Sequence, residues 1–82
     1  MNKEERKEMN GLELIFSIAV NGPIHIIKLR YPRETTEADN LTEHGLLKKG
    51  GEGNNFYDLT EKGDKLYKQI YNFYKMKITG NL

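Results

Sequence analysis

Residues 46–63, LLKKGGEGNNFYDLTEKG, predict a β-hairpin that leads directly into a helix. Residues 46–49 and residues 56–59 are short runs suited to strands, because Leu47 with Lys49, and Tyr57 with Leu59, would fall on matching sides under a period of two. The glycine-rich residues 50–55 between them predict a turn that needs positive φ angles. Thr60 follows the second run as a helix-capping residue, so the fold is expected to be built around this hairpin.

The helix after Thr60 is expected to run to about Ile78 and carries two neighbouring apolar stripes. One stripe is Leu66, Ile70 and Phe73, and the other is Tyr67, Tyr71, Tyr74 and Ile78. Together they span roughly 160° of the helix surface, more than the roughly 100° that a single core face requires. We therefore expect the tyrosine stripe to form a homodimer interface through this C-terminal helix, with base stacking by the rings as the less common alternative.

Residues 12–20, LELIFSIAV, predict the central helix, because apolar side chains cover nearly its whole circumference. Two capping boxes offer a start nearby, Asn2 with Glu5 or Asn10 with Glu13. The sequence Asn-Gly-Pro at residues 21–23 ends this helix. If the second start is used, residues 1–10 form a frayed extension.

Residues 23–45 predict two short helices around a proline corner. PIHIIKLRYP, residues 23–32, favours a helix, although weak alternation leaves a strand as the rival interpretation. ETTEADNLTEHG, residues 34–45, predicts a helix capped by Thr35 or Thr36 and ended at Gly45. Two consecutive helices joined by this corner make a helix-turn-helix.

Composition places the chain among small folded domains. It has 82 residues, no cysteine and a net charge of +1, so we expect a single domain, residues 1–82, without disulfides. The charged residues 1–10 do not resemble a secretory signal, and no apolar run is long enough to cross a bilayer, so a cytoplasmic setting without a membrane partner is expected. The charges are segregated along the chain. A basic cluster, Lys28, Arg30 and Arg33, precedes an acidic one, Glu34, Glu37, Asp39 and Glu43.

Side chains that carry catalysis are sparse. His25 and His44 lie 19 positions apart without a cysteine or a spaced carboxylate, which argues against a metal site or an acid–base pair. Ser17 lies on the central helix, and the glycines of residues 50–53 lack the Lys-Ser/Thr ending of a phosphate-binding loop. We therefore expect a protein that is not an enzyme and needs no cofactor or metal.

The order helix, helix, helix, hairpin, helix resembles the winged helix-turn-helix DNA-binding domains of small prokaryotic and phage transcription regulators. HGLLKK, residues 44–49, and FYDLTEKG, residues 56–63, carry the resemblance, which covers residues 11–78. In that family a Gly-Leu pair ends the recognition helix, and a Tyr-x-Leu-Thr-x-x-Gly phrase enters the last helix. The resemblance implies a mostly helical α+β fold, with a three-helix bundle, a hairpin wing and a long C-terminal helix.

The resemblance also implies binding to double-stranded DNA. The third helix would enter the major groove, and the wing would touch the backbone or the minor groove. The candidate contacts are the basic corner, the third helix and the wing. They are Arg30, Arg33, Thr35, Thr36, Asn40, Lys48, Lys49, Asn54 and Asn55.

The acidic third helix also supports a second hypothesis. Four acids in one helix oppose approach to a polymer that carries one negative charge per roughly 1.7 Å of axis. A winged helix could instead act as a protein-interaction module, of the kind found in phages and mobile elements, that docks on a basic surface of a host protein. Glu37, Asp39 and Glu43 would make that contact.

Overall fold

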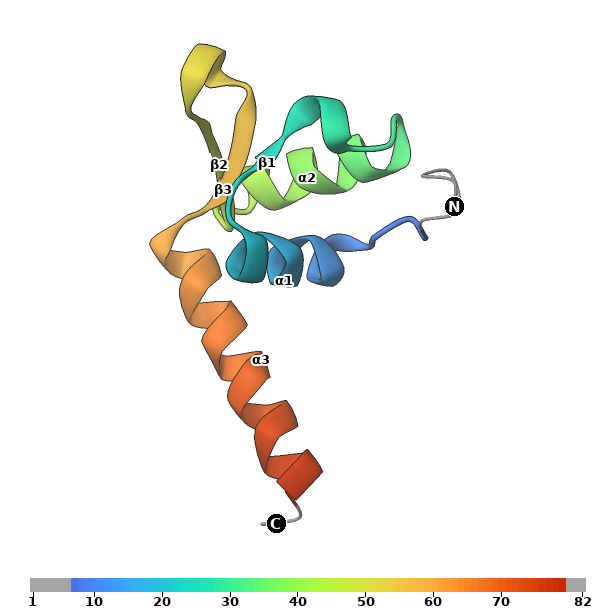
Figure 1. Ribbon diagram of the computed structural model, residues 1–82. Coiled ribbons are helices and arrows are strands. Elements are labelled where there is room, and N and C mark those ends of the chain that lie inside the picture. Colours follow the sequence, from blue (N-terminus) through green and yellow to red (C-terminus); the bar gives the residue numbers. More distant parts are fainter. Residues whose placement is uncertain (1–6, 80–82) are drawn as a thin grey trace.

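Three helices and a three-stranded antiparallel sheet make up residues 7–79, which the computed structural model describes, with side chains described through Lys75 (Figure 1). The domain is therefore α+β and mostly helical. Two 3₁₀ turns, η2 and η3, interrupt the connections. The elements are α1 (Gly11–Asn21), β1 (Ile24–His25), η2 (Ile26–Lys28), α2 (Arg33–Glu43), β2 (Leu47–Gly50), η3 (Glu52–Asn54), β3 (Phe56–Leu59) and α3 (Glu61–Thr79).

The predicted hairpin is confirmed, with β2 and β3 paired in antiparallel register from Leu47 opposite Leu59 to Gly50 opposite Phe56. Its turn uses positive φ angles at Gly51 (76°), Gly53 (67°) and Asn54 (61°), as the glycine-rich loop predicts. β1 adds a third strand on the other edge of β3, which puts β3 at the centre of the sheet. The hairpin projects from the body beside α2 (Figure 1).

α1 starts at the second of the two predicted capping boxes. The Asn10 side chain accepts a hydrogen bond from the Glu13 amide, and the Glu13 side chain accepts one from the Asn10 amide, both at 2.9 Å. Leu14, Ile15 and Ile18 are buried, but Leu12 is 41% exposed and Val20 is 70% exposed. The predicted central helix is therefore confirmed, since α1 packs against α2, α3 and β3, although one side of it stays exposed because so short a chain has too few elements to surround it.

The favoured helix at residues 23–32 is wrong, and the rival interpretation, a strand, is confirmed for its first part. Ile24 and His25 form β1, paired with Tyr57 and Phe56 of β3, and only one 3₁₀ turn follows. The His25 ring nitrogen Nδ1 accepts the Ile27 amide and caps that turn. Pairing with a strand distant in sequence outweighs the weak local preference for a helix, so α2 is preceded by a turn instead of a second α-helix. The predicted helix-turn-helix at residues 23–45, and the three-helix bundle before the hairpin, are therefore wrong for the described chain, which has two α-helices ahead of the hairpin and α3 after it.

α2 begins at Arg33, before the predicted caps Thr35 and Thr36. Its N-cap is Pro32, which makes no side-chain capping bond and follows a cis Tyr31–Pro32 peptide. The prediction of a threonine cap is therefore wrong. The predicted end is confirmed, since Gly45 adopts a φ of 78° just beyond the helix.

α3 is capped by Thr60, as predicted, because the Thr60 hydroxyl oxygen accepts the Gly63 amide at 3.0 Å. Gly63 allows the helix to approach the start of β2, since a Cβ there would lie 2.2 Å from the Leu46 carbonyl oxygen. The far half of α3 extends beyond the body of the domain (Figure 1). Among the described residues, no helix combines the length and the apolarity needed to cross a membrane.

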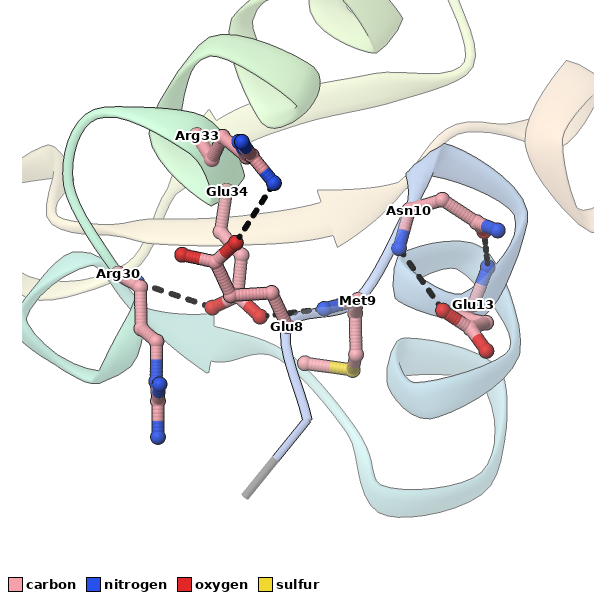
Figure 2. Close-up of polar contacts among 7 residues, drawn as sticks. All are labelled: Glu8, Met9, Asn10, Glu13, Arg30, Arg33 and Glu34. Carbon is pink, nitrogen blue, oxygen red and sulfur yellow. Dashed lines mark hydrogen bonds and ion pairs between the residues drawn. The ribbon is translucent and has the colours of Figure 1, made fainter. Parts of the chain in front are cut away.

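A fully buried carboxylate, Glu34, joins the N-terminal segment to the start of α2 (Figure 2). It accepts hydrogen bonds from the Met9 amide at 2.6 Å and from the Arg30 amide at 2.9 Å. Beside it, Arg33 forms an ion pair with Glu8 at 3.3 Å. Residues 7–10 are therefore held on the domain, so the expected frayed extension is wrong for them, while residues 1–6 lie outside the described chain.

Replacement of Glu34 by alanine is expected to lower the free energy of unfolding by at least about 2 kcal/mol, because two partly buried amides lose a charged acceptor. Urea denaturation followed by circular dichroism measures the loss. Glu43→Ala is the matched control in the same helix and should change stability by less than about 0.5 kcal/mol, since Glu43 is exposed. Equal effects of the two substitutions would contradict a structural role for Glu34.

Candidate nucleic-acid interface

One side of α2 presents a solvent-exposed stripe of mixed polar residues. Arg33, Thr36, Asn40 and Glu43 recur at helical spacing, and each is exposed. Thr35, a predicted contact, is half-buried beside this stripe, and its amide donates to the Arg30 carbonyl. The structure therefore brings together Arg33, Thr36 and Asn40 from the predicted set and leaves Thr35 at its edge.

Three of the four acids of α2 contact their own fold. Glu34 is the buried acceptor described above. Glu37 is half-buried, and its Oε1 lies near the start of α1, 2.9 Å from the position that a Cβ on Gly11 would take. Asp39 accepts a hydrogen bond from the Tyr57 hydroxyl at 2.5 Å. Glu43 is the remaining acid, and it lies on the exposed stripe.

Tyr57 connects α2 to the hairpin. Its side chain is 1% exposed, its hydroxyl donates to Asp39, and the Lys49 Nζ lies 5.4 Å from the centre of its ring. Burial, followed by the hydrogen bond and the negative charge of Asp39, raises the pKa of Tyr57 to about 12. Sequence reasoning missed this junction, although a tyrosine on the inward side of a strand needs a partner for its hydroxyl. The junction places Lys49 next to α2.

The two hairpin lysines, predicted to act together, lie on different faces of β2. Lys49 covers Tyr57 on the face toward α2, whereas Lys48 follows the strand alternation to the other face, where Asp58 is its cross-strand partner. A groove of about 630 Å³ beside the hairpin is bordered by both lysines, with Pro23, Gly50, Gly51, Phe56 and Asp58. An acid therefore accompanies Lys48.

The hairpin tip carries the two predicted amides, Asn54 and Asn55, and both side chains are exposed. The Asn55 carbonyl accepts the Ile26 amide at 2.9 Å, which ties the tip to η2. The tip therefore presents two hydrogen-bonding side chains from a loop that a backbone hydrogen bond holds in place.

The predicted basic corner, Arg30 and Arg33, lies next to Glu34 (Figure 2). The Arg30 side chain is directed away from that carboxylate, which its own amide contacts. The Arg33 side chain is 80% exposed while it pairs with Glu8. Glu8, which the sequence did not single out, therefore places a negative charge at this corner.

The predicted dimer stripe divides into packed and exposed parts. Tyr67 packs edge-to-face on Phe16 of α1, with ring centres 5.0 Å apart, and Tyr71 stacks on Tyr67 at 6.0 Å. Tyr74 lines a groove between α1 and α3. Ile78 lies beyond the last described side chain.

The two histidines serve local structure. His25 caps η2, and the Nδ1 of His44 lies 2.8 Å from the Asn40 carbonyl oxygen at the end of α2. Residues 7–75 contain no group of three or more histidines and carboxylates that could hold a metal ion.

Comparison of the chain with protein-family models, with curated proteins and with solved structures finds no match.

Replacement of Asp39 by asparagine is expected to lower the pKa of Tyr57 below about 12, while burial keeps it above the ordinary value of 10.0. The chain has five tyrosines, so the difference between the ultraviolet phenolate titrations of the protein and of its Tyr57→Phe variant isolates this one. Because the folded pKa exceeds the unfolded one, the phenol stabilises the fold fully below pH 10.0 and loses this contribution toward pH 12. An unchanged titration of Tyr57 in Asp39→Asn would contradict the contact.

Proposed function

We propose that this domain is a winged helix that binds double-stranded DNA, with α2 at the major groove and the β2–β3 hairpin as the wing. The proposed role is binding, without catalysis or a cofactor. The element order α1, β1, α2, β2, β3, α3 supports it, as does the hairpin that projects beside α2 (Figure 1). Because fold analogy alone is weak support for function, the side chains of α2 and the hairpin must carry the proposal.

The proposal rests mainly on which way the acidic side chains of α2 point. Sequence reasoning counted four acids against DNA, but Glu34, Glu37 and Asp39 contact their own fold. The exposed stripe then offers Arg33, Thr36 and Asn40 with Glu43, and Asp39 lies exposed beside it with its carboxylate engaged by the Tyr57 hydroxyl. Asparagine can pair with adenine through two hydrogen bonds, and arginine and threonine can contact phosphate.

The hairpin supplies the second part of the proposed contact. Tyr57 holds Lys49 beside α2, so one lysine can reach a phosphate next to the groove that the helix enters. Asn54 and Asn55 at the tip add neutral hydrogen-bonding groups. Because Glu8 accompanies Arg33 and Asp58 accompanies Lys48, the net positive charge is small and binding should be weak and sensitive to salt.

The alternative function, docking of an acidic α2 on a basic host protein, has less support from the same residues. Asp39 is held by the Tyr57 hydroxyl, and Glu37 is half-buried near the start of α1. Of the three acids assigned to that surface, Glu43 remains on the exposed stripe. Asp39 is exposed as well, but its carboxylate already accepts the Tyr57 hydroxyl, which leaves Glu43 as the main acid of that surface, so the DNA-binding proposal is preferred.

Replacement of Lys49 by alanine is expected to weaken binding to DNA uniformly across sequences and to reduce the slope of log affinity against log salt by about 1. Fluorescence anisotropy with labelled random-sequence duplex at several low salt concentrations measures both quantities. Lys65→Ala is the matched control, because Lys65 is exposed on α3, away from the hairpin. Equal losses for the two variants, or no binding by the unmodified protein at the lowest salt, would refute the proposed site.

Replacement of Glu43 by lysine is expected to tighten binding to the same duplex several-fold, because it exchanges the one acid on the stripe for a phosphate-binding cation. The same anisotropy titration measures the change. The variant with both Gln69→Lys and Asn72→Lys adds the same two positive charges on exposed positions of α3 and is the control. If the control tightens binding as much as Glu43→Lys, net charge and not the α2 stripe determines affinity. If Glu43→Lys weakens binding, α2 does not face the groove.

A further inference from the structure

One side of the domain, formed by α1 and α3, exposes a set of large apolar side chains. On α1, Leu12 is 41% exposed and Val20 is 70% exposed. On α3, Tyr71, Phe73 and Tyr74 are 49%, 58% and 51% exposed. We refer to these five residues, together with Phe16, as the α1–α3 face. Single exposed apolar residues are common, but several of them on two packed helices of so small a domain indicate an interaction surface.

The face is hollowed where the two helices diverge. Tyr67 and Phe16 are in contact, whereas the far half of α3 leaves the body (Figure 1). A groove of about 500 Å³ opens between the helices and is lined mainly by apolar atoms. Leu12, Phe16 and Val20 form its α1 wall, and Tyr74 lies on its α3 side. The chain therefore carries an open apolar groove and, next to it, a projecting helix with apolar side chains.

We propose that the α1–α3 face is the interface of a homodimer, in which the projecting half of α3 of each copy lies in the α1–α3 groove of the other. A two-fold interface requires one patch to supply both the ridge and the groove. This chain supplies both, with Phe73 and Tyr74 on the ridge and Leu12 and Val20 in the groove. A small ligand would fill the groove and leave Phe73 and Tyr71 in water.

The charges at the margin of the face suit the same arrangement. Glu13 lines the groove on α1, and Lys75 is exposed near the projecting end of α3. When the end of α3 from one copy enters the groove of the other, this lysine approaches an acid of opposite charge.

The exposed area is of the order that such a dimer needs. An aromatic side chain buries 150–250 Å² when covered, so three rings at about half exposure contribute roughly 300 Å² per chain, to which Leu12 and Val20 add. A stable interface buries roughly 800 Å² per partner, so the apolar centre would supply about half, with the polar margin as the remainder.

The α1–α3 face is separate from the surface proposed to bind DNA. The DNA contacts were assigned to α2 and the hairpin, whereas the dimer contacts lie on α1 and α3. The proposed interface differs from the tyrosine stripe predicted from the sequence, because Tyr67 already packs on Phe16 within one chain and is not free to contact a second copy. The groove wall on α1 takes its place. The dimer is tested without DNA, so failure of one proposal leaves the other standing.

Sedimentation velocity over a range of protein concentrations up to the solubility limit tests the dimer. The unmodified protein should shift from the mass of one chain to that of two as the concentration rises. Val20→Lys and Phe73→Lys each place a charge in the buried centre, so each should raise the dissociation constant of the dimer at least tenfold. Both side chains are more than half exposed in one chain, so circular dichroism should show an unchanged fold.

Matched controls come from exposed apolar residues elsewhere on the domain. Ile27 is 80% exposed and Tyr31 is 84% exposed, and both lie outside the α1–α3 face. Ile27→Lys and Tyr31→Lys should leave the dissociation constant unchanged. A mass of one chain at every concentration overturns the proposal, whether or not another molecule can occupy the groove. A dimer that resists Val20→Lys and Phe73→Lys, or that the controls weaken equally, overturns it as well.

Discussion

The carboxylate of Glu34 holds three parts of the chain in register. A charge buried without partners is too costly to retain, so its position requires the amides of Met9 and Arg30 to approach it. Met9 belongs to the segment that leads into α1, and Arg30 to the turn before α2 (Figure 2). Glu34 therefore fixes the distance between the two helices at their N-terminal ends, and the core residues Leu14 and Ala38 can pack between them. The bonds also supply what the missing threonine cap would have supplied, order at the start of α2.

Contacts of acidic side chains within the fold also explain the charge pattern of α2. In a linear sequence four acids within ten residues indicate a negative surface, but Glu34 accepts two amides, Asp39 accepts a hydroxyl, and Glu37 is half-buried near the start of α1. Asp39 is the most informative case, since its bond to Tyr57 both stabilises the phenol and connects α2 to the sheet. The exposed surface of α2 carries Asp39 and Glu43 with Arg33, so it is less acidic than the composition of the helix suggests. Its character is therefore set by which side chains the fold uses, and not by the composition of the helix.

Local signals predicted the parts of the fold that depend on neighbours in sequence. Three features each involve residues within a few positions of one another and can be recognised in the sequence. They are the capping box at Asn10, the cap at Thr60 and the glycine turn of the hairpin. The two-residue strand β1 was only the rival interpretation, because its stability comes from β3, about thirty residues later. The bond from Glu34 to Met9 spans 25 positions and has no local signature. Of the candidate site, the residue types were predictable, but not that Lys48 and Lys49 face opposite sides or that Tyr57 joins Asp39 to Lys49.

The exposed side of α1 follows from the size of the domain. A chain of 82 residues cannot enclose a helix that is apolar almost all round, because small domains bury only about 60% of their unfolded surface. The sheet and α2 cover the inner side of α1, and the first turns of α3 cover part of the rest, which leaves Leu12 and Val20 in water. Apolar surface of this kind weakens solubility unless another molecule covers it. A second copy is the one partner that is always present with this chain, and its own projecting α3 has the same unmet apolar surface, so association removes both from water at once.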